Sequence, residues 1–122
     1  MYRIGELAKQ FDVNSDTLRY YEKEGLLTNI SRNESGRRVY SEVDLTWLIW
    51  IQRLKSTGMT LGDIKRFSAL RSMGDSSISD RKNMLIGHAK KLKADIQRLN
   101  DELDIVEFKV EAYQEKENEL LT

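Results

Sequence analysis

Two short stretches of the chain bring arginine and tyrosine side chains together. They contain Thr17, Arg19 and Tyr20 in the first stretch, and Arg37, Arg38 and Tyr40 in the second. A guanidinium binds a phosphate or a guanine edge through two parallel N–H groups, and a tyrosine hydroxyl can hydrogen-bond a phosphate. This combination is typical of noncovalent binding to a phosphate-bearing polymer.

Each of these side chains also has an ordinary structural explanation. Arg19 could form a surface ion pair with Glu22, and for Arg19 alone that explanation is the better one. Tyr40 could hydrogen-bond a phosphate or anchor its segment to the core, and the sequence favours neither role. The assignment therefore depends on the elements that position these residues.

The residue inventory gives no support to covalent or metal chemistry. The chain has no cysteine, and His88 is its one histidine. No glycine-rich phosphate loop is present. We therefore expect no catalytic residue, no bound metal and no cofactor. The chain can form no disulfide, and it has neither a signal-peptide pattern nor an apolar run of roughly 20 residues. We therefore expect a cytoplasmic protein.

The charges of the chain balance overall but are unevenly distributed. Lys and Arg number 20, and Asp and Glu also number 20. Residues 1–74 contain 12 basic and 9 acidic side chains, whereas residues 75–122 contain 8 and 11. Because this N-terminal surplus is small, any basic surface must arise from the way the fold groups the side chains.

The first arginine stretch lies in a pattern that predicts two helices joined by a short turn. Residues 4–11 carry apolar side chains at helical spacing, and residues 12–14 interrupt them. Ser15 is a good N-cap for a second helix, which would end near Gly25. This pair is a helix-turn-helix unit, whose second helix would expose Thr17, Arg19, Tyr20 and Lys23.

The second arginine stretch lies in a segment whose residues predict a β-hairpin. Asn33, Ser35 and Gly36 form the expected loop tip, with short extended segments on each side. The hairpin would be a wing beside the helix-turn-helix. An ordinary surface loop with solvated charges is the alternative.

Two further helices are expected over residues 41–57 and 60–74, each opened by a capping box. The first contains five bulky apolar residues in a row, Trp47 to Ile51. A helix that is apolar on all sides must be covered on all sides. We expect one face to pack on the helix-turn-helix and the other on a partner chain. The second helix carries Leu61, Ile64, Phe67 and Leu70 on one stripe.

The clearest periodicity follows after residue 77. Nine apolar residues alternate at spacings of four and three, which predicts a coiled coil in a helix about 60 Å long. These seam residues are Leu85, Ala89, Leu92, Ile96, Leu99, Leu103, Val106, Val110 and Tyr113. No later helix could receive the seam, so the expected partner is a second copy. We expect two domains: residues 1–74, a helix-turn-helix domain that carries both arginine stretches, and residues 75–122, which would dimerise.

Charge along this helix favours an antiparallel homodimer. Residues 78–98 hold six basic and two acidic side chains, whereas residues 99–122 hold two and eight. Antiparallel pairing sets opposite charges against each other, although each exposed pair contributes only about 0–1 kcal/mol. Ile105, Phe108 and Ala112 form an apolar stripe outside the seam. It should pack on the partner's third or fourth helix; the alternative is a wall of a pocket for an unidentified small-molecule effector.

Taken together, these motifs resemble the MerR family of transcription regulators in order and spacing, over nearly the whole chain. The matching segments are Ile4–Ala8, Thr17–Glu22, Gly25–Leu27, Gly36–Tyr40 and Leu54–Leu61. The resemblance implies a mainly α fold with a winged helix-turn-helix domain and a long antiparallel coiled-coil dimerisation helix.

The resemblance also implies a set of contacts with double-stranded DNA. Thr17, Arg19 and Tyr20 would face DNA from the recognition helix. Arg37, Arg38 and Tyr40 would hold the wing to the backbone, and Lys55 would reach a phosphate. The homodimer would bind a palindromic operator in a promoter spacer and distort it, which controls transcription by RNA polymerase.

The sequence departs from the sensing branches of the family. Metal-sensing and thiol-sensing members carry cysteines that are absent here, and drug-binding members append a large C-terminal domain. The effector therefore cannot be read from the chain. An architectural or anchoring DNA-binding protein without promoter control is the alternative function, and an enzyme or a pure coiled-coil adaptor is a more distant one.

Overall fold

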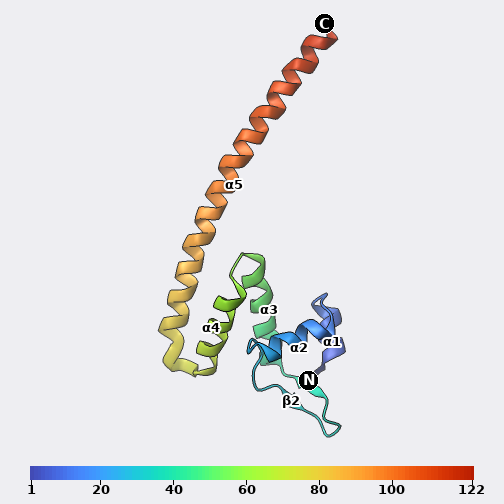
Figure 1. Ribbon diagram of the computed structural model, residues 1–122, viewed down its shortest axis with the longest axis vertical. Coiled ribbons are helices and arrows are strands. Elements are labelled where there is room, and N and C mark those ends of the chain that lie inside the picture. Colours follow the sequence, from blue (N-terminus) through green and yellow to red (C-terminus); the bar gives the residue numbers. More distant parts are fainter. The chain divides into compact units, whose positions relative to one another are not determined.

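Helices form most of the computed structural model, which describes residues 1–122 (Figure 1). The helices are α1 (Ile4–Gln10), α2 (Ser15–Lys23), α3 (Glu42–Ser56), α4 (Leu61–Ser72) and α5 (Ile78–Leu121). The strands are β1 (Tyr2–Arg3), β2 (Ser31–Arg32) and β3 (Arg38–Tyr40), and a short 3₁₀ helix, η1 (Gly74–Ser77), precedes α5. The expected order of helix, turn, helix, hairpin and three further helices is confirmed.

The helix-turn-helix is formed by α1 and α2, but its second helix begins differently from the prediction. Asn14, not Ser15, is the N-cap, and its side chain accepts a hydrogen bond from the Thr17 backbone N–H at 2.8 Å. Asparagine is as good an N-cap as serine, so the sequence offered two adjacent candidates. At the other end, Gly25 takes a positive φ of 80° and ends the helix as expected.

The wing is a hairpin of β2 and β3, and β1 adds a third strand that the sequence did not predict. The strand order is β1-β3-β2, with both pairs antiparallel. In this register Arg3 lies opposite Val39, and Arg32 lies opposite Arg38. At the loop tip, Asn33 Oδ1 accepts hydrogen bonds from the backbone N–H groups of Ser35 and Arg37, each at 3.0 Å.

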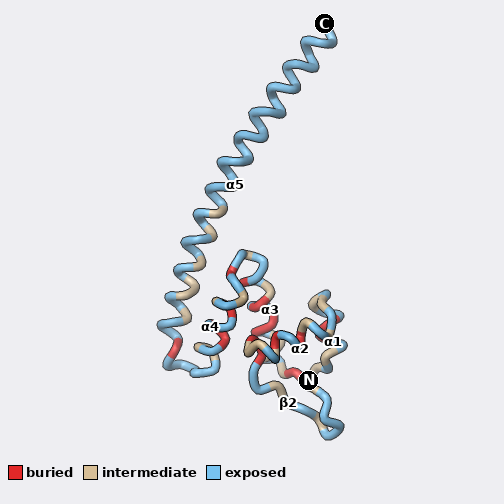
Figure 2. The backbone as a smooth tube through the Cα atoms, in the orientation of Figure 1, coloured by how far each residue is buried: buried red, intermediate tan, exposed pale blue.

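The core lies between the helix-turn-helix, α3 and α4 (Figure 2). On α3, Trp47 is buried and its indole N–H donates to the Leu26 carbonyl at 2.6 Å. The Trp47 ring stacks on Phe67 of α4 with centroids 5.6 Å apart, and the Arg71 guanidinium lies 4.3 Å from the Trp47 ring centroid. The outer face of α3 is open within one chain, where Trp50 is 40% exposed.

The chain divides into two units, Met1–Leu85 and Ile86–Thr122. The first unit extends beyond residue 74, because Met84 and Leu85 on the first turns of α5 pack against the core. The second unit is the remainder of α5, which is exposed almost throughout (Figure 2). No helix of the chain is long and apolar enough to cross a membrane.

Two glycines give a matched test of the turn that ends α2. A Cβ at Gly25 would meet only Lys65 Cε at 3.9 Å, so the cost of Gly25→Ala comes from its positive φ alone. We expect Gly25→Ala to lower the free energy of unfolding by about 1–2 kcal/mol. Gly62→Ala, in α4 with open space around it, should raise that free energy by about 0.4–1 kcal/mol.

Urea unfolding followed by circular dichroism would measure both variants. Equal effects of the two substitutions would contradict the left-handed conformation of Gly25.

Candidate nucleic-acid interface

The recognition helix α2 has an inner face and an outer face. Leu18 and Tyr21 are buried in the core, so Arg19 and Tyr20 are directed outward and are exposed. Thr17 is half-buried, and its hydroxyl donates to Asn14 Oδ1 at 2.9 Å. The predicted outward face is therefore present, although the Thr17 hydroxyl already takes part in the helix cap.

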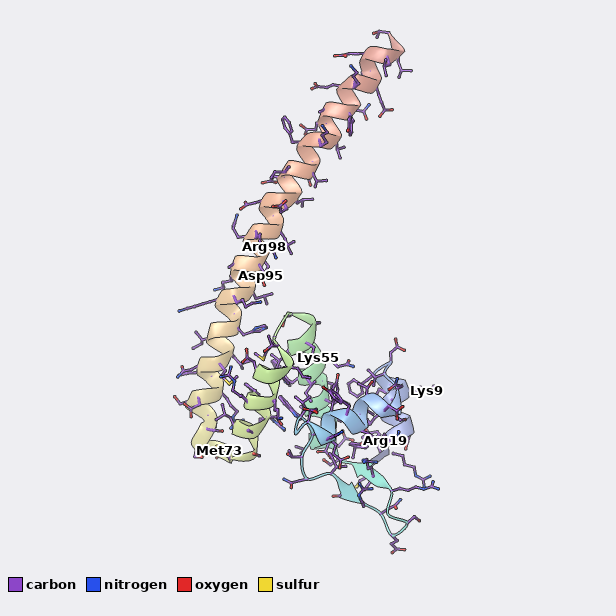
Figure 3. The ribbon with its side chains drawn as sticks, viewed as in Figure 1. Lys9, Arg19, Lys55, Met73, Asp95 and Arg98 are labelled. Carbon is purple, nitrogen blue, oxygen red and sulfur yellow. The ribbon has the colours of Figure 1, made fainter.

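Arg19 forms an ion pair, but with Asp16 rather than with Glu22. Its Nη1 lies 2.8 Å from Asp16 Oδ1. Because the pair is exposed, it contributes only about 0–1 kcal/mol. Arg19 can therefore leave Asp16 for a phosphate or a base at little cost. Figure 3 labels Arg19 on α2, in the part of the domain that carries the wing.

A cleft lies between the N-terminal segment, α2 and the wing, and it is strongly basic. We call it the basic cleft; its volume is about 630 Å³. Its lining residues are Arg3, Ile4, Gly5, Glu6, Arg19, Arg32, Gly36, Arg37 and Arg38. Five arginines face one carboxylate here, which gives the concentrated positive charge that net composition does not reveal.

Arg3 and Arg32 are the two arginines of the basic cleft that sequence reasoning did not assign to the site. Arg3 reaches the cleft because β1 pairs with β3, a contact between residues far apart in the chain. Arg32 donates from Nη1 to the Gly36 carbonyl at 2.9 Å and so also supports the wing. The clustering of Arg32, Arg37 and Arg38 within seven residues was the only local signal.

Arg38 joins the wing to the recognition helix. Its Nε donates to Glu22 Oε2, and the two side chains are only 24% and 25% exposed. Arg38 was expected to contact the DNA backbone. The structure gives it an additional internal partner while leaving part of the side chain in the wall of the basic cleft.

Tyr40 lies in the core with 0% exposure, which favours the anchoring role over a direct phosphate contact. A buried ring on β3 holds the wing to the domain by packing. Its hydroxyl is buried and has no hydrogen-bond partner. Burial, and then the neighbouring Glu22 carboxylate, raise the pKa of Tyr40, so the hydroxyl is protonated at neutral pH.

A second cleft brings together the other predicted contacts. We call it the polar cleft; it is lined by Asn14, Asp16, Thr17, Tyr20, Tyr21, Lys55 and Leu61. Lys55, labelled on α3 in Figure 3, is exposed, and its Nζ donates to the Tyr21 hydroxyl at 2.8 Å. Six of the seven predicted DNA contacts thus line one of two clefts that α2 helps to form.

The nine predicted seam residues all lie on α5. Leu85 and Leu92 are half-buried, while the residues from Ile96 to Tyr113 on the seam are 50–62% exposed. The row is therefore continuous and largely open to solvent within one chain. No group of three or more His, Cys, Asp or Glu side chains is placed to hold a metal ion.

Two family models match the chain. One, described as MerR HTH family regulatory protein, matches residues 2–70, and one described as MerR, DNA binding, matches residues 45–104. The chain belongs to the MerR family. Members of this family are helix-turn-helix transcriptional regulators that bind DNA, and this chain is one of them.

Similar proteins extend over nearly the same length. An uncharacterised HTH-type transcriptional regulator of Haemophilus influenzae is 41% identical, over 93% of this chain and 84% of the relative. A crystal structure of HiNmlR, a MerR family regulator lacking the sensor domain, bound to promoter DNA, has a TM-score of 0.85 and 40% identity, and covers 93% and 90% of the chains. A MerR family regulator from Listeria monocytogenes has a TM-score of 0.88 and 31% identity, covering 93% and 86%.

Arg37 offers a direct test of the basic cleft, because its exposed side chain lines the cleft on the wing. We expect Arg37→Ala to weaken binding to all duplexes alike and to reduce the slope of log K against log salt by about one, since one phosphate contact is lost. Fluorescence anisotropy over a salt series measures the slope. Arg66→Ala on α4, outside both clefts, is the control and should leave the slope unchanged.

Tyr40→Phe separates the two roles of Tyr40. Removing a buried hydroxyl without a partner should leave stability unchanged or raise it by about 1 kcal/mol. If Tyr40 only anchors the wing, the affinity for DNA should also be unchanged. Anisotropy and thermal unfolding measure the affinity and the stability. A loss of affinity with unchanged stability would show that the Tyr40 hydroxyl contacts a phosphate.

Proposed function

We propose that the chain acts as a homodimer that binds a palindromic operator in a promoter spacer and controls transcription by distorting the DNA. The observation that carries this proposal is the joint presence of an arginine-lined cleft on the recognition helix and wing, and a long exposed apolar row on α5. The cleft would bind one half-site of the operator. The apolar row would join two copies, so that their two DNA-binding domains lie at a fixed separation.

Each domain would bind one half-site. Arg19 and Tyr20, exposed on α2, would enter the major groove, with Thr17 at the start of the helix. The arginines of the wing, together with Arg3, would contact phosphates on one side. Lys55, in the polar cleft, would contact a phosphate on the other. These contacts fix position first, and base contacts by α2 add sequence preference.

The two copies would join along the seam of α5. Burying each exposed leucine or isoleucine of that row contributes roughly 1.5–3 kcal/mol, which a second helix can supply. The antiparallel arrangement is supported by the basic first half and acidic second half of α5. The stripe of Ile105, Phe108 and Ala112 would pack on the third or fourth helix of the partner; Phe108 is 73% exposed in the single chain.

Control of transcription would come from the geometry of the bound DNA. Two domains on a rigid link can bind a continuous palindrome only if the duplex between them adopts a fitting bend and twist. Such a deformation costs several kcal/mol, and the phosphate contacts can offset it. Access of RNA polymerase to the two promoter elements would then depend on the deformed spacer. Similarity to HiNmlR, whose structure was solved with promoter DNA, supports this use of the fold.

Leu99→Asp tests the link between dimerisation and DNA binding. Leu99 is 58% exposed at the middle of the seam, and a carboxylate there would face apolar side chains of the partner. We expect a monomer by sedimentation and a loss of at least about 100-fold in affinity for a palindromic duplex, because one half-site lacks avidity.

Ala94→Asp is the matched control, with the same added charge on the opposite side of α5. It should remain a dimer and bind DNA as the wild type does. A Leu99→Asp variant that is still dimeric, or that binds the palindrome with unchanged affinity, would overturn the proposed dimer.

A further inference from the structure

Glu22 places a negative charge on the helix that is expected to face DNA, where a carboxylate is unfavourable. It lies on the recognition helix between the outward residues Arg19 and Lys23. An unpaired negative charge at this position would repel the phosphate backbone and weaken binding. Since Glu22 is instead paired with Arg38 and is largely buried, its role is to be sought in that pair.

The pair uses only one edge of the Arg38 guanidinium. Glu22 Oε2 accepts from Nε, which leaves the Nη1 and Nη2 groups for other partners. Arg38 also lines the basic cleft, whereas Glu22 does not. The carboxylate therefore orients the guanidinium through its Nε group and leaves the two Nη groups available.

Fixing Arg38 also fixes the other arginines of the sheet. Arg38 lies opposite Arg32 on β2, and the next residue of β3, Val39, lies opposite Arg3 on β1. These strands are only two or three residues long, so few backbone hydrogen bonds hold the sheet. An ion pair from β3 to α2 thus sets the positions of three cleft arginines relative to Arg19.

We propose that Glu22 is a positioning residue for specific DNA recognition, which acts through Arg38 to hold the wing in register with the recognition helix. This proposal rests on the proposed function, in which the chain binds a specific operator. It makes Glu22 favourable for specific binding in spite of its charge. A carboxylate that merely lies near the DNA would have the opposite effect.

The test is a double-mutant cycle of Glu22→Ala, Arg38→Ala and the double variant. The probes are a duplex that the full-length wild-type protein selects from a random-sequence library and a scrambled duplex of the same composition. We expect Glu22→Ala to lower affinity for the selected duplex about tenfold. Affinity for the scrambled duplex should be unchanged or higher, because one negative charge is removed. In the Arg38→Ala background the carboxylate has no partner, so Glu22→Ala should no longer lower the affinity for the selected duplex and should raise both affinities alike.

Two further variants separate positioning from stability and from charge. Glu22→Gln keeps the hydrogen-bond acceptor and the size of the side chain, so it should restore a large part of the lost preference for the selected duplex. Glu24→Ala makes the same charge change at the end of the same helix, where Glu24 Oε2 lies 3.8 Å from Lys65 Nζ. It should not lower the affinity for the selected duplex.

The outcomes are distinct. The proposal is overturned if Glu22→Ala tightens binding to both duplexes, if it weakens both equally, or if its effect adds to that of Arg38→Ala. It is also overturned if Glu22→Gln, folded by circular dichroism, behaves as Glu22→Ala does. If the wild-type protein selects no duplex at all, the proposed function itself fails, which is a different result.

Discussion

The side chain of Trp47 connects the elements on which the DNA-binding face depends. Its indole N–H donates to the carbonyl of Leu26, the second residue after Glu24 at the end of the recognition helix, and Ser68 on α4 donates to the same oxygen at 3.0 Å. The ring also stacks on Phe67 and carries the Arg71 guanidinium above it. One buried ring therefore fixes the end of α2 to α3 and α4 at once. Because indole is large and its N–H must be paired when buried, few other side chains could fill this position.

Two kinds of ion pair serve the recognition surface differently. The exposed Arg19–Asp16 pair on α2 is weak and easily exchanged for a contact with DNA. The Arg38–Glu22 pair is partly buried and joins two elements. A side chain that reads DNA must be available, whereas a side chain that holds the frame must stay in place. In the proposed function, the difference in burial between these pairs would leave Arg19 available for DNA and keep Arg38 in place.

Local patterns in the sequence predicted the helices and the wing, because their caps and apolar spacing lie within a few residues of one another. The Ser41–Asp44 capping box and the left-handed glycine after α2 are present as expected, and Gly58 after α3 takes the same conformation. Three of the features that sequence reasoning missed are nonlocal: the pairing of Tyr2 with Tyr40 that creates β1, the position of Arg3 in the basic cleft, and the pair between Arg38 and Glu22. Burial favours the anchoring role of Tyr40 over the phosphate contact, and only packing in three dimensions determines burial. The sequence could not distinguish Asn14 from Ser15 as the N-cap, because asparagine and serine have almost equal preference for that position.

The open apolar row of α5 would make the formation of the dimer depend on the concentration of the protein. Such a row can be covered only by another molecule, so the covered fraction rises with concentration. For two copies that associate reversibly, the concentration of dimer follows the square of the free-chain concentration at low levels. A small increase in synthesis would then produce a larger increase in competent pairs, and dilution by growth would reverse it. The uncovered row of one helix would thus make the amount of competent dimer respond more steeply than the amount of the chain itself.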